Sequence, residues 1–586
     1  MTVHETPESA ESAPPMEPGS LVLDAEAKKP IDRWIFGIAA VLVVAFIAWG
    51  VISTETLSAV STAVLGGVMN AGGWAFVLIA SGFVVFALWL AFSRYGKIPL
   101  GADDEGPEFR TVSWIAMMFS AGMGIGLMFY GVSEPLSHFT SPPPGTVEAG
   151  SPAALDVAMA TTLFHWTLHP WAIYAVVGLA IAYSTFRRGR SQLVSSAFAP
   201  LLGERRTQGA FGKFVDILAI FATLFGSAAS LGLGTLQIGA GLEANGLPPA
   251  ETPLLLGIIA LLTIAFVASA VSGVAKGIQW LSNINMVLAG VLALFVFVAG
   301  PTILILNLVP TAIGDYLGDM AQMAARTAAT GGDATAEWLS SWTVFYWAWW
   351  ISWTPFVGMF IARISRGRSI KQFVVGVLLI PSAVSLLWFA IFGGAAIQAQ
   401  RDGNDLASAG LEGQLFGLLH SLPLGGLMSI IAMALVAIFF VSGADAASVV
   451  TGTLSQRGTI EPARGVVIFW GVVMGAIAGI MLAVGAGQDD ALTGIRDITI
   501  ISAAPFALVM VVLCIALAKD LNNDPLMRRD RRSAAAVEQA VEFGTEKYGD
   551  EFVVAVKPHP DAGKDTADEN SASGNGAAPA KDDRTS

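Results

Sequence analysis

Long apolar segments separated by short polar ones make up most of the chain. A helix needs about 20 apolar residues to cross the hydrocarbon layer of a membrane. Only helices and closed barrels satisfy their backbone hydrogen bonds in lipid, and the strands of a barrel would alternate polar and apolar side chains. The pattern therefore predicts an all-α polytopic membrane protein. Its twelve expected transmembrane helices are 34–54, 72–93, 112–133, 160–184, 213–238, 253–273, 279–308, 340–362, 374–396, 424–453, 465–486 and 498–518.

The composition agrees with a membrane protein and excludes several other classes. Of the 586 residues, 54% are hydrophobic and only 13% are charged, whereas a soluble domain carries about a quarter charged residues. The 32 basic and 45 acidic side chains are too few to hydrate the surface of a soluble protein of this size. A cytosolic enzyme, a nucleic-acid-binding protein and a disordered scaffold are therefore excluded.

Lysine and arginine are distributed unequally between the two sets of short loops. The even-numbered loops, with their helix edges, carry sixteen of these residues, and the odd-numbered loops carry three, Arg326, Arg401 and Arg496. Short loops rich in lysine and arginine stay on the cytoplasmic side of a membrane. We therefore expect both termini in the cytoplasm.

The two ends of the chain differ in composition from the part between them. We expect an acidic cytoplasmic tail at 1–33, a twelve-helix core at 34–518 and a second cytoplasmic tail at 519–586. The second tail contains a helix-prone piece at 533–549 and a polar end with the composition of a disordered segment. A basic cluster precedes the helix-prone piece and is suited to anionic lipid headgroups. Its members are Arg528, Arg529, Arg531 and Arg532.

Two further stretches combine apolar positions with small and polar ones. These are residues 311–337 and 405–422. We expect both to lie along the membrane surface as amphipathic connectors, and a role in subunit contact is the alternative.

Closely spaced glycines interrupt the third segment. Gly122, Gly124 and Gly126 alternate in A-G-M-G-I-G, and S-E-P follows at 133–135. Close helix packing through small residues is one explanation. However, each glycine destabilises a helix by about 1 kcal/mol relative to alanine, and an unwound helix leaves carbonyl groups free to bind an ion. We therefore expect a functional break in this helix.

Tryptophan is concentrated in the eighth segment, where six of the sixteen tryptophans fall within sixteen residues. An aromatic belt at the membrane surface accounts for Trp338 and Trp342. It does not account for Trp349, Trp350 and Trp353, which lie in the middle of the segment. A desolvated cation over an indole face gains about 2 kcal/mol or more. The cluster therefore indicates a site for a quaternary ammonium group, which has no hydrogen to donate.

The fourth segment adds further aromatic residues. Trp171 and Tyr174 share a helix face at a spacing of three residues, and Trp166 lies near that face. His165 and His169 have the spacing of a metal-binding pair, but no third ligand is evident. We therefore favour two hydrogen-bonded structural histidines over a metal site.

The eighth predicted helix comes five helices after the third, and each of the two begins a group of five helices. Transporters built from two inverted five-helix repeats have discontinuous helices in this arrangement. The positions of the expected breaks therefore predict two such repeats, helices 3–7 and 8–12.

These motifs resemble the betaine/carnitine/choline transporter family, and most closely its actinobacterial sodium-coupled glycine betaine carriers. The resemblance covers roughly 34–518 and rests on G-M-G-I-G-L-M-F-Y-G-V-S-E-P, H-W-x-x-H-x-W-A-I-Y and F-Y-W-A-W-W-I-S-W-x-P-F-V-G. It implies a leucine-transporter-like fold and a homotrimer in the bacterial inner membrane. It also implies import of glycine betaine or a related compatible solute with sodium, for osmoprotection, by alternating access. No cofactor is implied beyond the coupling sodium ion.

The resemblance also assigns functional residues. The predicted substrate-binding residues are Trp166, Trp171, Tyr174 and Trp350 of the family's aromatic box, Trp349 and Trp353 along the path, and Met123 and Gly126 of the glycine stretch. The first sodium site falls on Thr223, Ser227 and Phe356. The second falls on Ser120, Met123, Phe439 and Ser442.

Two glycines modify this assignment. Gly443 stands where coupled members of the family carry a second hydroxyl, and a hard cation prefers several oxygen ligands, so the second sodium site lacks one expected ligand. Gly126 stands where choline carriers of the family tend to place an acid. A glycine there favours a zwitterion, whether betaine, ectoine or proline.

Two alternatives to sodium-coupled import remain open at the level of sequence. One is proton-coupled or exchange transport of choline or carnitine. The other is a membrane osmosensor or receptor that signals through the C-terminal tail. A membrane enzyme is disfavoured, because no nucleophile, base and acid are clustered in one site.

Overall fold

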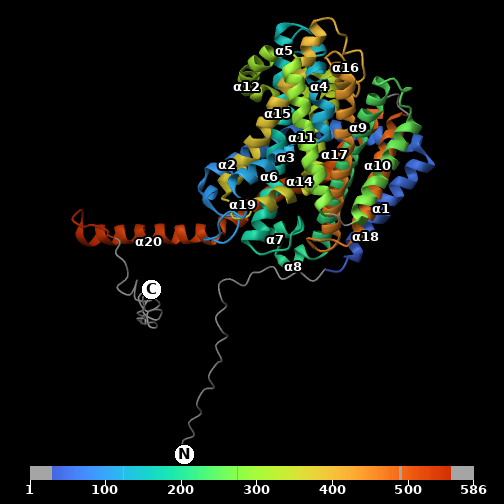
Figure 1. Cartoon of the computed structure of the whole chain (residues 1–586). Coiled ribbons are helices and arrows are strands. Elements are labelled where there is room, and N and C mark those ends of the chain that lie inside the picture. The colour runs from blue at the N-terminus through green and yellow to red at the C-terminus, as the bar shows by residue number, and fades with distance from the viewer. Residues whose placement is uncertain (1–28, 123, 273–274, 487–490, 556–586) are drawn as a thin grey trace, which may run out of the picture. The chain divides into compact units, whose positions relative to one another are not determined.

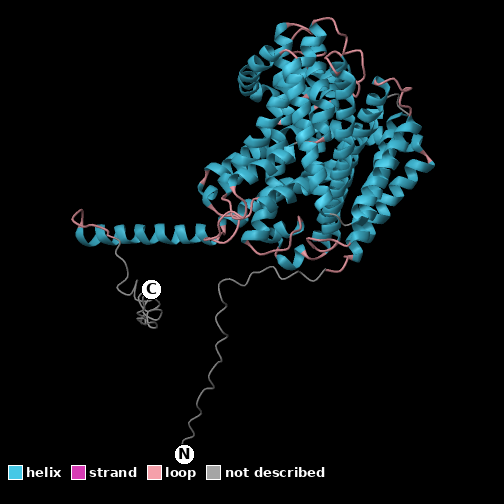
Figure 2. Ribbon diagram, in the orientation of Figure 1, coloured by secondary structure: helices cyan, strands magenta, loops and turns pink. Residues whose placement is uncertain are grey.

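The computed structural model describes residues 29–122, 124–272, 275–486 and 491–555. Within these residues the regular structure is helical, apart from one isolated bridge between Pro99 and Ser369, as Figure 2 shows. The all-α prediction is therefore confirmed for this part of the chain. The described residues divide into two units, a first unit that ends at Leu521 and a second that begins at Asn522.

The first unit is built mainly from long helices (Figure 1). Its helices of seven or more residues are α1 Arg33–Ile52, α2 Thr54–Phe92, α3 Thr111–Gly122, α4 Ile125–Thr140, α5 Pro152–Trp166, α6 Leu168–Ala182, α9 Ala210–Ala244, α10 Thr252–Ser272, α11 Ala275–Ala299, α12 Thr302–Ala324, α13 Ala328–Ser341, α14 Thr343–Ile364, α15 Ile370–Arg401, α16 Gln414–His420, α17 Gly425–Ser455, α18 Arg464–Ala486 and α19 Ala491–Asn522. Shorter turns of helix are η1 Arg94–Lys97, η2 Tyr183–Arg187, η3 Ser195–Phe198, α7 Ala199–Leu202 and α8 Glu204–Thr207.

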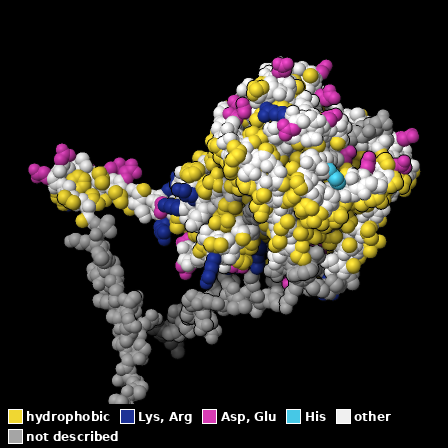
Figure 3. All heavy atoms as spheres, turned by 45° about the horizontal axis from the view of Figure 1, so that its top comes forward, with side chains coloured by type: hydrophobic (Ala, Val, Ile, Leu, Met, Phe, Trp, Pro, Cys, Tyr) yellow, Lys and Arg dark blue, Asp and Glu magenta, His cyan; other side chains and the backbone are white. Residues whose placement is uncertain are grey.

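Ten helical segments of the described chain are long and apolar enough to cross a membrane. Every one of the twelve predicted segments overlaps a helix, but the number twelve is not confirmed. The third predicted segment is divided between α3 and α4, and neither half is among the ten. Hydrophobic side chains cover much of the first unit's face in Figure 3. Among the exposed hydrophobic side chains, Val51 and Leu261 are 72% and 66% exposed.

The seventh predicted segment, 279–308, is two helices in the structure. Gly300 and Pro301 separate α11 from α12, because proline lacks the N–H that a continuing helix needs. The segment α12 is itself among the ten candidate spans, whereas residues 311–337 were expected along the membrane surface. Within 405–422, the other stretch expected there, the structure forms the short helix α16.

The helix breaks match the predictions only in part. The third segment is interrupted at the predicted glycines, where Gly124 is fully extended (φ −172°, ψ −178°) before α4 begins. The eighth segment was expected to carry a break, but α14 continues through Pro355. The break lies instead before α14, at Trp342 (φ −124°, ψ −86°).

An unpredicted break divides the fourth segment. Thr167 has φ −116° and ψ −110°, so α5 ends at Trp166 and α6 begins at Leu168. Pro170 gives the physical reason, since its ring cannot donate to the carbonyl of Trp166 and clashes with it.

The second unit contains one described helix, α20 Pro525–Tyr548. The Asp524 side chain caps it by accepting from the Leu526 N–H, and Pro525 occupies the first position, where a missing N–H costs nothing. The helix therefore begins before the predicted 533–549 and includes the basic cluster of four arginines.

Candidate functional site

One cavity of the first unit lies among α4, α5, α6, α14 and α15. Its lining consists of Gly124, Gly126, Leu127, Trp166, Pro170, Trp171, Tyr174, Trp349, Trp350, Trp353, Val357 and Ser385. The structure thus brings together every predicted substrate-binding residue except Met123, which lies outside the described residues. The side chains of Trp166, Trp171, Tyr174, Trp349 and Trp350 are buried.

The break at Thr167 places aromatic residues of two helices around the cavity. Trp166 is the last residue of α5, and Trp171 and Tyr174 follow in the first two turns of α6. The Trp171 and Tyr174 rings meet edge to face with centroids 5.3 Å apart. The interruption allows residues on either side of it to line one site.

The helix α14 supplies the opposite wall. The rings of Trp349 and Trp350 are stacked, with centroids 4.7 Å apart and planes inclined by 14°. The Trp166 ring stands nearly perpendicular to Trp350, with centroids 4.9 Å apart, and Tyr174 lies 6.2 Å from Trp350. The rings therefore surround the space on more than one side.

Each indole N–H of this wall is engaged by a neighbouring helix. Trp350 Nε1 donates to the backbone carbonyl of His165 at 3.0 Å. Trp349 Nε1 donates to Ser230 Oγ at 3.1 Å, and Trp353 Nε1 donates to the Gly226 carbonyl at 2.9 Å. These bonds fix the rings and leave their π-electron surfaces, rather than their N–H groups, to interact with a ligand.

Position 126 requires a glycine, because the neighbouring indole rings leave no space for a side chain. A Cβ atom added there would lie 2.8 Å from Cη2 of both Trp166 and Trp349, a distance that real Cβ contacts essentially never show. The absence of a side chain lets the two indoles close over the backbone of α4.

The chemistry of the cavity suits a cation without N–H groups. Its described lining has no charged side chain, and its hydroxyls belong to Tyr174 and Ser385. Aromatic faces attract a quaternary ammonium group through the ring quadrupole, and the attraction grows when the site is desolvated.

The residues predicted to form the first sodium site lie on α9 and α14, two helices that contact each other. A Cβ atom added at Gly226 of α9 would be 2.5 Å from Ser352 Cβ of α14, so the helices touch there. Thr223 and Ser227 flank this contact on α9, and both are buried. Phe356 lies one turn beyond Trp353 on α14, with ring centroids 5.7 Å apart.

The structure does not describe all the residues predicted to form the second sodium site, so it does not bring them together. Met123 lies outside the described residues, and the side chain of Ser120 is not described. Phe439 and Ser442 lie on α17, where Ser442 Oγ donates to the Ile438 carbonyl at 2.8 Å. Space is open around Gly443, since an added Cβ would meet nothing within 4 Å.

The two histidines of the fourth segment do not form a metal pair. His165 hydrogen-bonds through Nδ1 with Glu134 at 2.7 Å and through Nε2 with Thr343 at 2.9 Å. His169 Nε2 lies 3.4 Å from Ser81 Oγ, on the other side of the break at Thr167. Both side chains are therefore hydrogen-bonded in the structure, and a purely structural role for them stays a prediction.

Sequence reasoning missed several residues around the site. Tyr346 stacks on Trp350 with centroids 5.9 Å apart, and the spacing of four residues on one helix face was a usable signal. Ser230 and Ser385 offered no such signal, since each lies in an ordinary apolar segment distant in the sequence from the aromatic motifs.

Comparisons with known proteins identify relatives along almost the whole chain. The family model described as "BCCT, betaine/carnitine/choline family transporter" matches residues 34–526. The betaine/ectoine transporter LcoP of Corynebacterium glutamicum is 46% identical over 93% of this chain and 86% of its own length. The glycine betaine transporter OpuD of Bacillus subtilis is 44% identical over 86% and 97%. An ectoine/hydroxyectoine transporter of Virgibacillus pantothenticus is 37% identical over 85% and 98%.

Among solved structures, a Na+-coupled sialic acid symporter in a substrate-bound, outward-open state aligns with this chain at a TM-score of 0.38 and 15% identity. The alignment covers 77% of this chain and 86% of the symporter. The score is too low to establish a shared fold.

Proposed function

Because the chain belongs to the betaine/carnitine/choline family of transporters, we propose that it imports glycine betaine or a related compatible solute together with sodium. The protein is a multi-pass membrane transporter rather than an enzyme. The observation that carries the substrate proposal is the convergence of Trp166, Trp171, Tyr174 and Trp350 on one cavity.

The aromatic cavity supports a trimethylammonium group as the recognised part of the solute. Such a group carries a positive charge but no N–H, so it gains little from hydrogen-bond acceptors. It gains about 2 kcal/mol or more from desolvated aromatic faces. The ring arrangement supplies such faces on several sides.

A zwitterion is favoured over a purely cationic solute. The described cavity lining contains no acid, and Gly126 leaves no room for one without displacing Trp166 and Trp349. The names of the relatives point the same way, since they mention betaine and ectoine. Ectoine is therefore the second candidate solute.

We propose that the coupling sodium ion binds at the first predicted sodium site. Thr223 and Ser227 are buried residues of α9 on either side of Gly226, which packs against α14, and hydroxyl oxygens suit a hard cation. The aromatic wall lies on the same pair of helices, since Trp353 is hydrogen-bonded to Gly226. A cation bound between α9 and α14 would therefore stabilise the wall that binds the solute.

The remaining elements of the proposal concern the assembly and its membrane. We propose a leucine-transporter-like arrangement of two inverted five-helix repeats that works by alternating access for osmoprotection. The sixteen-to-three distribution of lysine and arginine supports cytoplasmic termini, and the inner membrane is the corresponding location in a bacterium. We also propose a homotrimer, as the family resemblance implies, and anionic lipids as the partners of the arginines on α20.

Uptake into proteoliposomes tests this proposal. Labelled glycine betaine should accumulate against its gradient when sodium is supplied outside and potassium inside. Replacing external sodium by potassium should abolish accumulation. Undiminished accumulation in potassium would contradict sodium coupling. Binding of glycine betaine without net accumulation would favour a receptor instead of a transporter.

A further inference from the structure

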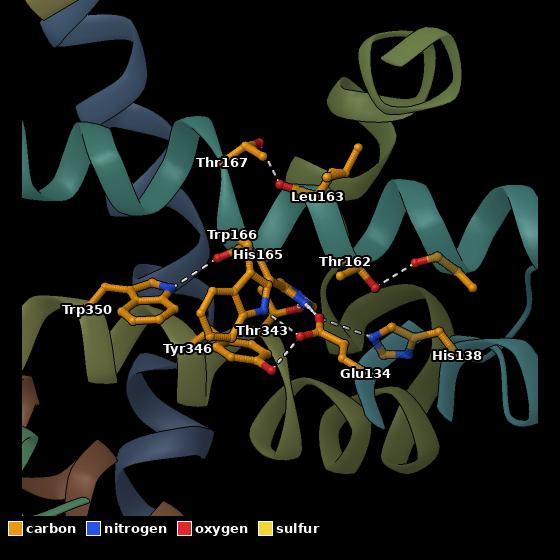
Figure 4. A network of polar contacts seen from close by, with 11 residues as sticks. Glu134, His138, Thr162, Leu163, His165, Trp166, Thr167, Thr343, Tyr346 and Trp350 are labelled. Atoms are coloured by element: carbon orange, nitrogen blue, oxygen red, sulfur yellow. Dashed lines mark hydrogen bonds and ion pairs between the residues drawn. The ribbon is translucent and has the colours of Figure 1, made fainter. Parts of the chain in front are cut away.

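Glu134 lies at the meeting point of the helices that form the aromatic cavity. It belongs to α4, and its side chain is fully buried. Its carboxylate accepts a hydrogen bond from Trp166 Nε1 at 2.6 Å and another from the Tyr346 hydroxyl, and it bonds with His165 Nδ1 at 2.7 Å. Figure 4 shows Glu134 among these residues.

Each of these partners belongs to the cavity wall or touches it. Trp166 is itself part of the lining. Tyr346 stacks on Trp350 at 5.9 Å and meets Trp166 edge to face at 5.4 Å. The backbone carbonyl of His165 accepts the Trp350 N–H. One carboxylate is therefore connected to both Trp166 and Trp350, two lining rings that meet edge to face with centroids 4.9 Å apart.

The same network joins three helices. Glu134 lies on α4, His165 and Trp166 end α5, and Tyr346 lies on α14. His165 also bonds through Nε2 with Thr343, the first residue of α14. In a buried site, a donor that loses its acceptor is costly, so these bonds constrain the angle of each ring.

Glu134 does not contact the cavity itself. The described lining contains no acid, and the carboxylate lies behind the Trp166 indole, at its N–H edge. A direct bond to a bound solute is therefore not its role.

A metal site is the alternative explanation for this cluster. The ligand atoms of Glu134, His138 and His165 lie within 4.8 Å of one another. However, Oε1 already bonds with His165, and Oε2 accepts from Trp166 and Tyr346. A metal would have to displace these bonds, whereas a positioning role uses them as they stand.

We infer that Glu134 is a positioning residue for solute binding, which holds the Trp166 indole and, through His165 and Tyr346, the Trp350 ring at the angles that form the aromatic site. The inference rests on the proposed function, because it assumes that these rings bind the solute. The site then depends on a buried carboxylate that the solute never touches.

A double-mutant cycle tests this inference in the full-length protein in proteoliposomes. Glu134→Ala should raise the KM for glycine betaine about tenfold, because Trp166 and Tyr346 lose their acceptor. Trp166→Phe removes the indole N–H, so adding Glu134→Ala to it should raise KM by less than about threefold more, as expected for coupled residues. Independent effects that multiply in the double variant would overturn the inference.

Conservative variants keep the test decisive if Glu134→Ala folds poorly. Glu134→Gln retains an acceptor oxygen and should raise KM by less than about threefold. Tyr346→Phe deletes a single donor and should raise KM severalfold without reducing the amount of protein in the membrane. Unchanged KM for Tyr346→Phe together with unchanged KM for Glu134→Ala would refute positioning.

Two controls separate the explanations. Asp216 is a buried acid of α9 that accepts from the Ser195 N–H and hydroxyl, so Asp216→Asn reports the general cost of altering a buried acid and should leave KM unchanged. Trp350→Ala tests the binding site itself. If Trp350→Ala leaves affinity unchanged, the proposed function fails. If only the Glu134 variants have no effect, this inference fails alone.

Discussion

The indole N–H of Trp350 donates to the backbone carbonyl of His165 at 3.0 Å, across 185 residues of sequence. This bond ties the aromatic wall on α14 to the end of α5, one residue before Trp166 and two before the break at Thr167. The helix ends where its last carbonyls are free to accept from a neighbour. The interrupted helix thus helps to assemble the aromatic cavity.

Trp350 itself gives the first prediction. Trp350→Ala should weaken glycine betaine binding by about 30-fold, since one desolvated cation–π contact is worth about 2 kcal/mol. Trp350→Phe keeps an aromatic face but loses the bond to His165, so its effect should be intermediate. Isothermal titration of the purified variants measures both.

An exposed tryptophan outside the cavity provides the control for that series. Trp34 is 68% exposed, and Trp34→Ala should bind glycine betaine with unchanged affinity. Equal affinities for Trp350→Ala and Trp34→Ala would contradict the role of Trp350.

Gly126→Ala should impair transport by displacing the two indoles that close over it. The added Cβ would be 2.8 Å from each ring, and overpacking of this kind costs about 1–3 kcal/mol. We expect the KM for glycine betaine to rise about fivefold or more. Gly82→Ala on α2 is the matched control, because its added Cβ meets nothing within 4 Å. Similar behaviour of the two variants would show that Trp166 and Trp349 do not need the space.

A serine at position 443 is predicted to strengthen sodium binding. A Cβ atom added there meets nothing within 4 Å, and a serine would restore the hydroxyl that the resemblance expects. Gly443→Ser should therefore lower the sodium concentration for half-maximal uptake, while Gly443→Ala, which adds no oxygen, should not. Thr223→Ala should raise that concentration, because it removes a proposed ligand of the first sodium site. An identical sodium dependence for all three variants would argue against both predicted sites.

Asp32 gives a prediction about stability and pH. It caps α1 by accepting from the Trp34 and Ile35 N–H groups and lies 3.4 Å from Lys213 Nζ. Burial alone would raise the pKa of Asp32, but the backbone hydrogen bonds from Ile35 and Trp34 and the charge of Lys213 outweigh it and hold the pKa below its usual value of 3.8. A depressed pKa stabilises the folded state above the unfolded pKa, and this stabilisation is lost as the pH falls through the folded value.

Asp32→Ala should therefore lower stability at pH 7 by about 1 kcal/mol, the usual effect of removing a helix cap. Asp32→Asn keeps a capping oxygen and should cost less. Thermal unfolding in detergent should show the difference between wild type and Asp32→Asn shrinking as the pH falls below about 4. A difference that stays constant with pH would mean that the charge of Asp32 contributes nothing.

The helical architecture was largely predictable because a membrane span must be a long apolar run. The breaks were harder to predict, because proline and glycine have different effects in different surroundings. Pro355 is accommodated within α14, whereas Pro170 follows a break at Thr167. Gly124 lies at a break, while Gly178 is simply packed against Ile361.

The aromatic residues of the cavity were predicted from their concentration in two segments and from the family motifs. The network behind them was not, because it depends on contacts between distant residues. Glu134 and Tyr346 are 212 positions apart, and no local pattern links them. Met123 and Ser120 remain predictions, since neither side chain is described.

The most direct test of the aromatic site compares glycine betaine with its carbon isostere, 3,3-dimethylbutanoate, which has the same shape but a tert-butyl group in place of the trimethylammonium group. Binding of each to the purified protein in the presence of sodium is measured by isothermal titration. If the rings recognise the positive charge, the isostere should bind at least about 30-fold more weakly. Equal affinity for the two compounds would contradict recognition of a quaternary ammonium group by this cavity.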